Sequence, residues 1–126
     1  MAINPSTAGI HHINLRCSNL EESKDFYENT MGFSIPLQTP ELFAFAAGTV
    51  FIVFKKAADG ATFDPFTIGM DHLAMACETE EELNRVAKGL TDAGVENTGV
   101  KLDETLQKLY VAFKDPDRIQ WEFYMA

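Results

Sequence analysis

The sequence predicts an α+β fold in which two βαβββ modules form a curved mixed sheet around a cavity, with the helices on its outer face. Three observations predict it: an internal repeat, a strand-like alternation before each of two helix starts, and three strand-like segments after each helix. The 126 residues fit one domain, and 46% hydrophobic residues are enough for a core. Each module is too small to be an independent domain, so we expect the two to pack together, within one chain or across a dimer.

The repeat lies in two segments that begin with a histidine and end in an acidic helix start. The segment His12–Glu22 matches His72–Glu82 at its first histidine, its cysteine and its last two glutamates. In each segment, the alternation of apolar and polar residues predicts a strand. Asn19 and Thr79 then predict helix N-caps, because a glutamate follows each of them three residues later. Each module is therefore expected to begin with a strand and a helix.

The remaining elements follow in the same order in both halves. Gly32 and Gly94 predict the ends of the two helices, because glycine readily adopts the left-handed conformation that stops a helix. We expect module one at about residues 9–56, a linker at 57–69 and module two at about 70–125, all within a single domain, 1–126. The strands expected after the helices are Phe33–Leu37, Leu42–Ala47, Thr49–Lys55, Val95–Val100, Gln107–Phe113 and Ile119–Met125.

Charge and composition exclude several classes of partner. The formal charge is −9 and the pI about 4.6, so we expect no binding to nucleic acid and none to membranes. No apolar run is long enough to span a membrane, and residues 1–8 lack the pattern of a signal peptide, so we expect a cytoplasmic protein. Cys17 and Cys77 are too few for a disulfide framework. Each closes an apolar strand pattern, so we expect two buried thiols.

The alternation also places three possible metal ligands on the faces that the helices leave uncovered. His12 and His72 begin their strands and Glu122 lies in the last one, and the parity of all three is opposite to that of the apolar residues. A single histidine or glutamate in a strand is more often structural or solvated. Two imidazoles and one carboxylate together, however, are a ligand set for a divalent metal. His11 has the opposite parity, and we expect it to be structural and to point to the other face.

Several stretches of the sequence resemble the vicinal-oxygen-chelate superfamily, which includes glyoxalases, bleomycin-resistance proteins, fosfomycin-resistance transferases and extradiol dioxygenases. The resemblance covers about residues 9–125. It implies paired βαβββ modules and a divalent metal (Fe, Mn, Ni, Co or Zn) that two substrate oxygens chelate. It implies His12, His72 and Glu122 as the ligands and places Val53 at the fourth ligand position. The stretches that carry it are Gly9–Arg16, Phe26-Tyr27, Met31-Gly32-Phe33, Met70–Ala74, and Asp115-Pro116-Asp117 followed by Glu122.

The resemblance leaves more than one chemistry open. Three ligands, with no carboxylate at Val53, match extradiol dioxygenases and fosfomycin transferases. However, Ala112 stands where ring-cleaving relatives have a tyrosine, and Asn14 stands where the transferases have a threonine. Arg16 stands where glyoxalases place an arginine for the glutathione carboxylate, and its alternative role is a cross-strand salt bridge. We predict a metal-dependent enzyme of the glyoxalase or dioxygenase type, an isomerase, lyase or dioxygenase, that acts on a small substrate with two adjacent oxygens.

The catalytic residues predicted for this enzyme are Glu122, Arg16 and Tyr110. Glu122 would also be a metal ligand. Arg16 and Lys108 would hold an anionic substituent of the small-molecule substrate, and Tyr110 and Tyr124 would shape the pocket.

The alternative function is a non-catalytic protein that binds or sequesters a small molecule, as bleomycin-resistance relatives do. Such a protein would need an aromatic groove but not all three ligands, whose joint presence favours an enzyme. We also expect a homodimer, because the two modules leave sheet edges that pairing would cover. Candidates for the aromatic groove are Phe43, Phe45, Phe51, Tyr110 and Tyr124.

Overall fold

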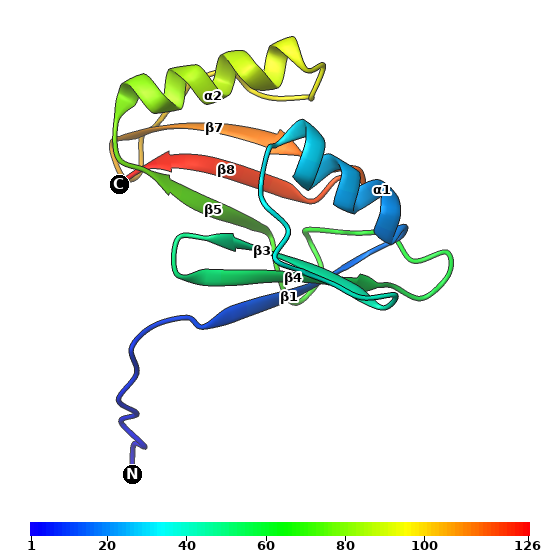
Figure 1. Cartoon of the computed structure of the whole chain (residues 1–126). Helices are drawn as coiled ribbons and strands as arrows, with labels where there is room; N and C mark the ends of the chain where they lie inside the picture. The colour runs from blue at the N-terminus through cyan, green and yellow to red at the C-terminus, as the bar shows by residue number, and fades with distance from the viewer.

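The structure, a computed structural model that describes all residues 1–126, confirms the α+β fold class. It contains two four-stranded mixed sheets, one from each half of the chain (Figure 1). No helix is both long enough and apolar enough to cross a membrane. The first half contains β1 (His12–Cys17), α1 (Leu20–Asp25), η1 (Phe26–Thr30), β2 (Leu37–Gln38), β3 (Leu42–Ala47) and β4 (Val50–Lys56). The second half contains β5 (His72–Cys77), α2 (Glu80–Asp92), β6 (Lys101–Asp103), β7 (Lys108–Lys114) and β8 (Gln120–Met125).

Both sheets have the same strand order, which places the repeated segment at an open edge. The orders are β1-β4-β3-β2 and β5-β8-β7-β6. β1 lies parallel to β4, and β5 lies parallel to β8, while the other neighbours are antiparallel. β1 and β5 therefore each have one side without a strand partner, and their first residues are His12 and His72. Such edges expose unpaired backbone groups.

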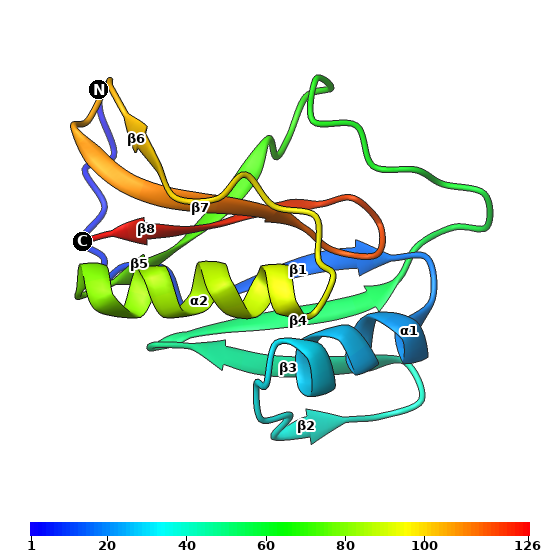
Figure 2. The same cartoon turned by 90° about the horizontal axis from the view of Figure 1, so that it is seen from above.

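Both helices are capped as the sequence predicts. The side chains of Asn19 and Thr79 accept hydrogen bonds from the backbone N–H groups of Glu22 and Glu82, at 3.0 and 3.1 Å. After α1 the chain continues as a short π-helix, η1, and Gly32 follows with a φ of 83°. Seen from above, the two helices lie on the same side of the molecule, between the outer strands β2 and β6 (Figure 2).

Two of the predicted strands are wrong. The range Phe33–Leu37 forms a strand only from Leu37 onward, and Val95–Val100 precedes β6 instead of forming it. In both segments the apolar side chains pack against the core from irregular backbone. Their apolar pattern reflects burial, which a loop over the core also needs, and not strand pairing. The other four strands agree with their predicted bounds to within one residue.

One hydrophobic core joins the two modules through their helix-covered faces. Tyr27 of η1 packs against Phe45 of the first sheet, with ring centroids 5.0 Å apart, and against Trp121 of the second sheet, at 6.0 Å. Cys17 and Cys77 belong to the same core as free thiols, as predicted, and burial raises the pKa of both. Because the apolar faces of the two sheets are turned inwards, the opposite faces remain uncovered.

Candidate metal centre

His72 and Glu122 lie next to each other on the uncovered face of the second sheet. β5 and β8 run parallel with His72 opposite Gln120 and Ala74 opposite Glu122, so alternation puts all four side chains on one face. The Nε2 atom of His72 lies 3.6 Å from the Oε2 atom of Glu122. The Glu122 side chain is only 10% exposed and that of His72 is 39% exposed. These two predicted ligands are therefore brought together within one chain.

Asp71 holds the other nitrogen of the His72 ring. Its Oδ1 atom lies 2.6 Å from the Nδ1 atom of His72. An ionised carboxylate can only accept a hydrogen bond, so this nitrogen is the donor. Asp71 was not among the predicted site residues, although it directly precedes the predicted ligand His72.

Gln120 and Lys114 hold the Glu122 carboxylate from the adjacent positions of the same face. The side-chain amide of Gln120 donates from Nε2 to Oε2 of Glu122 at 3.1 Å. The ammonium group of Lys114 donates to Oε1 of Gln120 at 3.2 Å. Because Lys114 can only donate, it fixes the orientation in which the Gln120 amide turns its N–H groups toward Glu122. These two residues were also missed, although their strand parity places them on the same face as Glu122.

His12 lies on the uncovered face of the first sheet and does not join His72 and Glu122 within one chain. Its ring contacts that of His11, with the two Nδ1 atoms 2.9 Å apart and the rings almost perpendicular at 87°. The expectation that His11 points to the other face is wrong, because His11 precedes β1 and strand alternation does not apply to it. Within one chain, no group of three or more histidine, cysteine, aspartate or glutamate side chains is placed to hold a metal ion.

Val53 occupies the position in the first sheet that Glu122 occupies in the second. Val53 lies opposite Asn14 of β1 and Ala44 of β3. In the second sheet, Glu122 lies opposite Ala74 of β5 and Ala112 of β7. Val53 is half-buried on the uncovered face, whereas its neighbour Ile52 is 3% exposed in the core. The strand register predicted for this residue pair is therefore confirmed.

A pocket of about 460 Å³ opens beside His72 and Glu122. The rings of Tyr110 and Tyr124 stack in it, with centroids 5.9 Å apart, and Tyr124 donates its hydroxyl to Asp103 at 2.7 Å. Burial, followed by the Asp103 carboxylate, raises the pKa of Tyr124 to about 12, and the same hydrogen bond lowers the pKa of Asp103. The pocket wall therefore carries a fixed negative charge. Its lining residues are His72, Ala74, Asp103, Leu106, Tyr110, Glu122 and Tyr124.

Arg16 lies on the same uncovered face as His12, but it forms no cross-strand salt bridge. Its guanidinium donates to the carbonyl oxygen of Lys56 at 3.0 Å, and the residue opposite it is Lys55, another cation. Lys108 donates to the carbonyl oxygen of Ala126 and does not line the pocket. The face around His12 is thus cationic at one end, while the pocket beside Glu122 carries the Asp103 anion.

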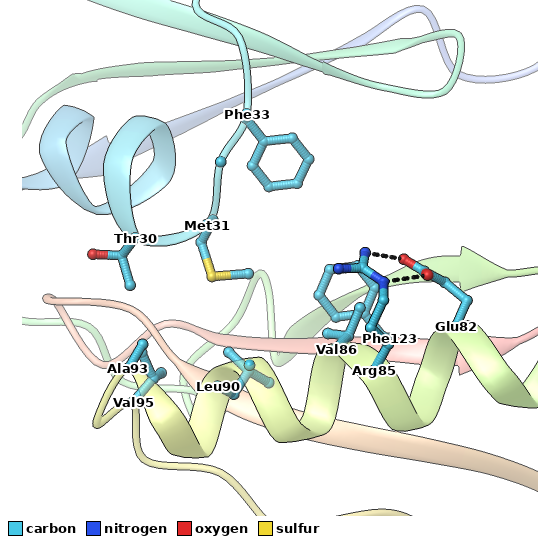
Figure 3. Close-up of a pocket in the computed structure, with 12 residues that line it drawn as sticks. Thr30, Met31, Phe33, Glu82, Arg85, Val86, Leu90, Ala93, Val95 and Phe123 are labelled. Atoms are coloured by element: carbon cyan, nitrogen blue, oxygen red, sulfur yellow. Dashed lines mark hydrogen bonds and ion pairs between the residues drawn. The ribbon is translucent and has the colours of Figure 1, made fainter.

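Two further pockets lie on the inward side of the sheets and hold none of the predicted ligands. One, of about 320 Å³, lies between the end of η1 and α2, where Met31 and Phe33 face Val86 and the Arg85–Glu82 ion pair (Figure 3). The other, of about 490 Å³, is almost entirely apolar and lies between the two sheets.

The expected aromatic groove does not form from all five of its candidates. Phe43 and Phe45 are 1% and 0% exposed in the core, so neither can line an open surface. Phe51 remains exposed on the first sheet, and Tyr110 and Tyr124 line the pocket on the second. Phe43 and Phe45 lie on the covered face of the first sheet, and both are core residues instead of groove residues.

The sequence matches the Glyoxalase/Bleomycin resistance protein/Dioxygenase superfamily over residues 9–123. The uncharacterized protein YwkD of Bacillus subtilis (strain 168) is 29% identical over 124 residues, which cover 91% of this chain and 94% of that protein. The solved structure of a glyoxalase family protein from Enterococcus faecalis is similar with a TM-score of 0.78, at 23% identity, covering 93% of this chain and 97% of that one. The lactoylglutathione lyase of Agrobacterium tumefaciens is similar with a TM-score of 0.78, at 15% identity, covering 97% and 96%. At these identities the two structures share the fold with this chain.

Proposed function

The chain belongs to the Glyoxalase/Bleomycin resistance protein/Dioxygenase superfamily, and on that premise we propose that it is a divalent-metal-dependent enzyme acting on a small substrate with two adjacent oxygens. The observation that carries the proposal is the pair His72 and Glu122, whose Nε2 and Oε2 atoms are 3.6 Å apart beside an open pocket. This separation is less than twice the usual ligand distance of about 2.1 Å, so one ion can contact both atoms. An imidazole and a carboxylate suit Fe, Mn, Ni, Co or Zn.

The third ligand, His12, is proposed to come from a second copy of the chain. Three observations support a site shared between two copies. First, His12 is exposed on the uncovered face of the first sheet, apart from His72. Second, β1 and β5, which begin with His12 and His72, are both open sheet edges. Third, the two modules of one chain already pack together through their opposite faces. Pairing module one of each copy with module two of the other would cover the edges and make two equivalent sites in a homodimer.

The chain's own residues would bind and orient the substrate. When bound, the metal would act as a Lewis acid on the substrate oxygens. Tyr110 lines the pocket and would donate its hydroxyl proton to a substrate oxygen, whereas the hydroxyl of Tyr124 is already held by Asp103. Arg16 and Lys55 would attract an anionic substituent at the other end of the site. The Asp103 carboxylate would disfavour an anion near Tyr124.

Neighbouring side chains hold the Glu122 carboxylate in place. Gln120 holds its Oε2 atom and Lys114 holds Gln120, so the carboxylate is fixed before any ligand arrives. Such pre-organisation lowers the cost of binding a metal and of stabilising charge in the substrate. In this proposal the catalytic residues are Glu122, Arg16 and Tyr110.

Two experiments test it. The first is metal analysis of untagged protein purified without added metal, where Glu122→Gln should lose bound metal that the wild type retains. The second mixes His12→Ala with Glu122→Gln protein after unfolding and joint refolding. Half of randomly assembled dimers are mixed, and each mixed dimer holds one intact site, so about one quarter of wild-type metal capacity should return. A site made within one chain would recover none, and wild-type protein that binds no divalent metal would contradict the enzyme proposal.

A non-catalytic binding protein is the second candidate. The apolar pocket of about 490 Å³ between the sheets has the size and lining of a small-molecule site, and it needs no metal. If this pocket carries the function, the wild type and Glu122→Gln should bind an apolar fluorescent probe equally well, with or without chelator.

A further inference from the structure

We infer that His11 and Asp71 are positioning residues, each of which holds the Nδ1 atom of the histidine that follows it and leaves Nε2 free to face a metal. The two residues occupy equivalent positions of the internal repeat, directly before His12 and His72. In both modules the ring nitrogen nearest to the preceding side chain is Nδ1. That Nε2 faces a metal rests on the proposed function, whereas the hydrogen bonds to Nδ1 do not depend on it.

In the second module, the geometry fixes the tautomer. The Oδ1 atom of Asp71 lies 2.6 Å from Nδ1 of His72, and a carboxylate can only accept, so the proton is on Nδ1. In a neutral imidazole, Nε2 then carries the lone pair that a metal needs. The distance of 3.6 Å from Nε2 to Oε2 of Glu122 is too long for a hydrogen bond. Nε2 of His72 therefore donates no hydrogen bond to Glu122.

In the first module, a histidine takes the place of the carboxylate. The Nδ1 atoms of His11 and His12 are 2.9 Å apart, so one of the two nitrogens donates and the other accepts. When His11 accepts, His12 carries its proton on Nδ1 and presents a bare Nε2, as His72 does. The two rings are nearly perpendicular, at 87°, with their centroids 5.2 Å apart. The repeat thus preserves the orienting position while changing the residue.

The two orienting residues should differ in strength. The Asp71–His72 hydrogen bond has a carboxylate acceptor and is charge-assisted, whereas the His11–His12 bond joins two imidazole rings and has no carboxylate partner. A carboxylate also raises the basicity of the imidazole that donates to it, and partners of metal-bound histidines usually contribute tenfold to a hundredfold to affinity. We therefore expect Asp71→Ala to weaken metal binding by about tenfold to a hundredfold, and His11→Ala by a smaller factor.

The test combines a measurement without metal and one with it. Nitrogen-15 NMR of the metal-free protein at mildly alkaline pH reports which ring nitrogen of His72 carries the proton. Wild type should show protonated Nδ1, Asp71→Asn should keep it because the amide oxygen still accepts, and Asp71→Ala should lose the preference. Cobalt titration followed by calorimetry then compares affinities. Glu78→Ala is the matched control, since Glu78 is an exposed carboxylate at the other end of β5 and has no contact with His72.

The outcomes separate this inference from the proposed function. The orienting role is supported if Nδ1 of His72 is protonated in the wild type and in Asp71→Asn but not in Asp71→Ala, whether or not cobalt binds. If cobalt does not bind, that result overturns the metal function alone. Protonated Nε2 in the wild type overturns the orienting role. So does an Asp71→Ala protein whose His72 tautomer and cobalt affinity match those of Glu78→Ala.

Discussion

The indole Nε1 of Trp121 donates a hydrogen bond of 2.8 Å to the hydroxyl oxygen of Tyr27, which links β8 of the second module to η1 of the first. The Tyr27 hydroxyl in turn donates a hydrogen bond of 2.7 Å to Oδ2 of Asp115. The Oδ1 atom of Asp115 accepts from the backbone N–H groups of Asp117 and Ile119, both at 2.9 Å. This chain of hydrogen bonds is a buried polar contact between the two modules.

Replacing Tyr27 by phenylalanine should destabilise the fold. The variant keeps the ring packing but leaves the Trp121 N–H without its acceptor and Asp115 without one donor. A buried polar group without a partner costs about 1–3 kcal/mol, so the free energy of unfolding should fall by at least that amount in urea denaturation. Tyr110→Phe is the control, because Tyr110 lies in the open pocket and should change stability little. Equal stability of the two variants would show that the Tyr27 hydroxyl does not hold the modules together.

The pH dependence of stability should reveal the buried Asp115 carboxyl. Burial raises its pKa above the ordinary value of 3.8, even though three hydrogen bonds to the carboxylate oppose the shift. A group with a raised pKa in the folded state favours folding most fully below its unfolded pKa. Its contribution is lost as the pH rises through the folded pKa. The stability of the wild type relative to Asp115→Asn should therefore decrease as pH rises from about 3.8 and then level off.

Urea denaturation of both proteins at a series of pH values measures that difference. The comparison with the variant is needed because exposed carboxylates such as Glu82 and Glu96 have pKa values lowered by arginine partners. Those groups lose stabilisation as the pH falls, which is the opposite direction. If the stability of the wild type relative to Asp115→Asn instead increased with pH, the raised pKa of Asp115 would be contradicted.

Substituting glutamate at neighbouring positions of β4 should have opposite consequences. Val53→Glu places a carboxylate on the uncovered face, at the position equivalent to Glu122, and should tighten nickel or cobalt binding if the proposed site forms there. Ile52→Glu buries a charge in the core and should destabilise the fold by several kcal/mol. Calorimetric metal titration and melting temperatures compare the two. Similar destabilisation by both, with no gain in metal affinity from Val53→Glu, would count against the position assigned to Val53 in the site.

Both thiols should be unreactive in the native protein. Cys17 is 1% exposed and Cys77 is 4% exposed, and burial raises the pKa of each, so neither forms the reactive thiolate at neutral pH. Reaction with a thiol-specific chromogenic reagent should be slow in buffer and complete, at two thiols per chain, in denaturant. Rapid reaction of one thiol in buffer would show that its strand end opens easily.

The sequence by itself determined the parts of this protein that depend on local chemistry. The repeated histidine segments, the capping residues Asn19 and Thr79 and the strand alternation predicted the two modules and the strand faces. Alternation also put His72 and Glu122 on one face and distinguished Val53 from Ile52. These features follow from periods of two residues in strands and from hydrogen bonds over a few residues, which can be read from neighbouring positions.

Only the tertiary structure decided which faces meet. It turned the helix-covered faces of both sheets toward each other and buried Phe43 and Phe45, so that His12 lies apart from His72 within one chain. The local pattern also does not show that Asp71 contacts His72, because that contact depends on side-chain rotamers. Nor does it show that Lys114 contacts Gln120, because that contact depends on which residues face each other across paired strands. The physical reason is that alternation gives the face of a strand, whereas the packing of two similar apolar faces is settled by the shapes of side chains distant in sequence.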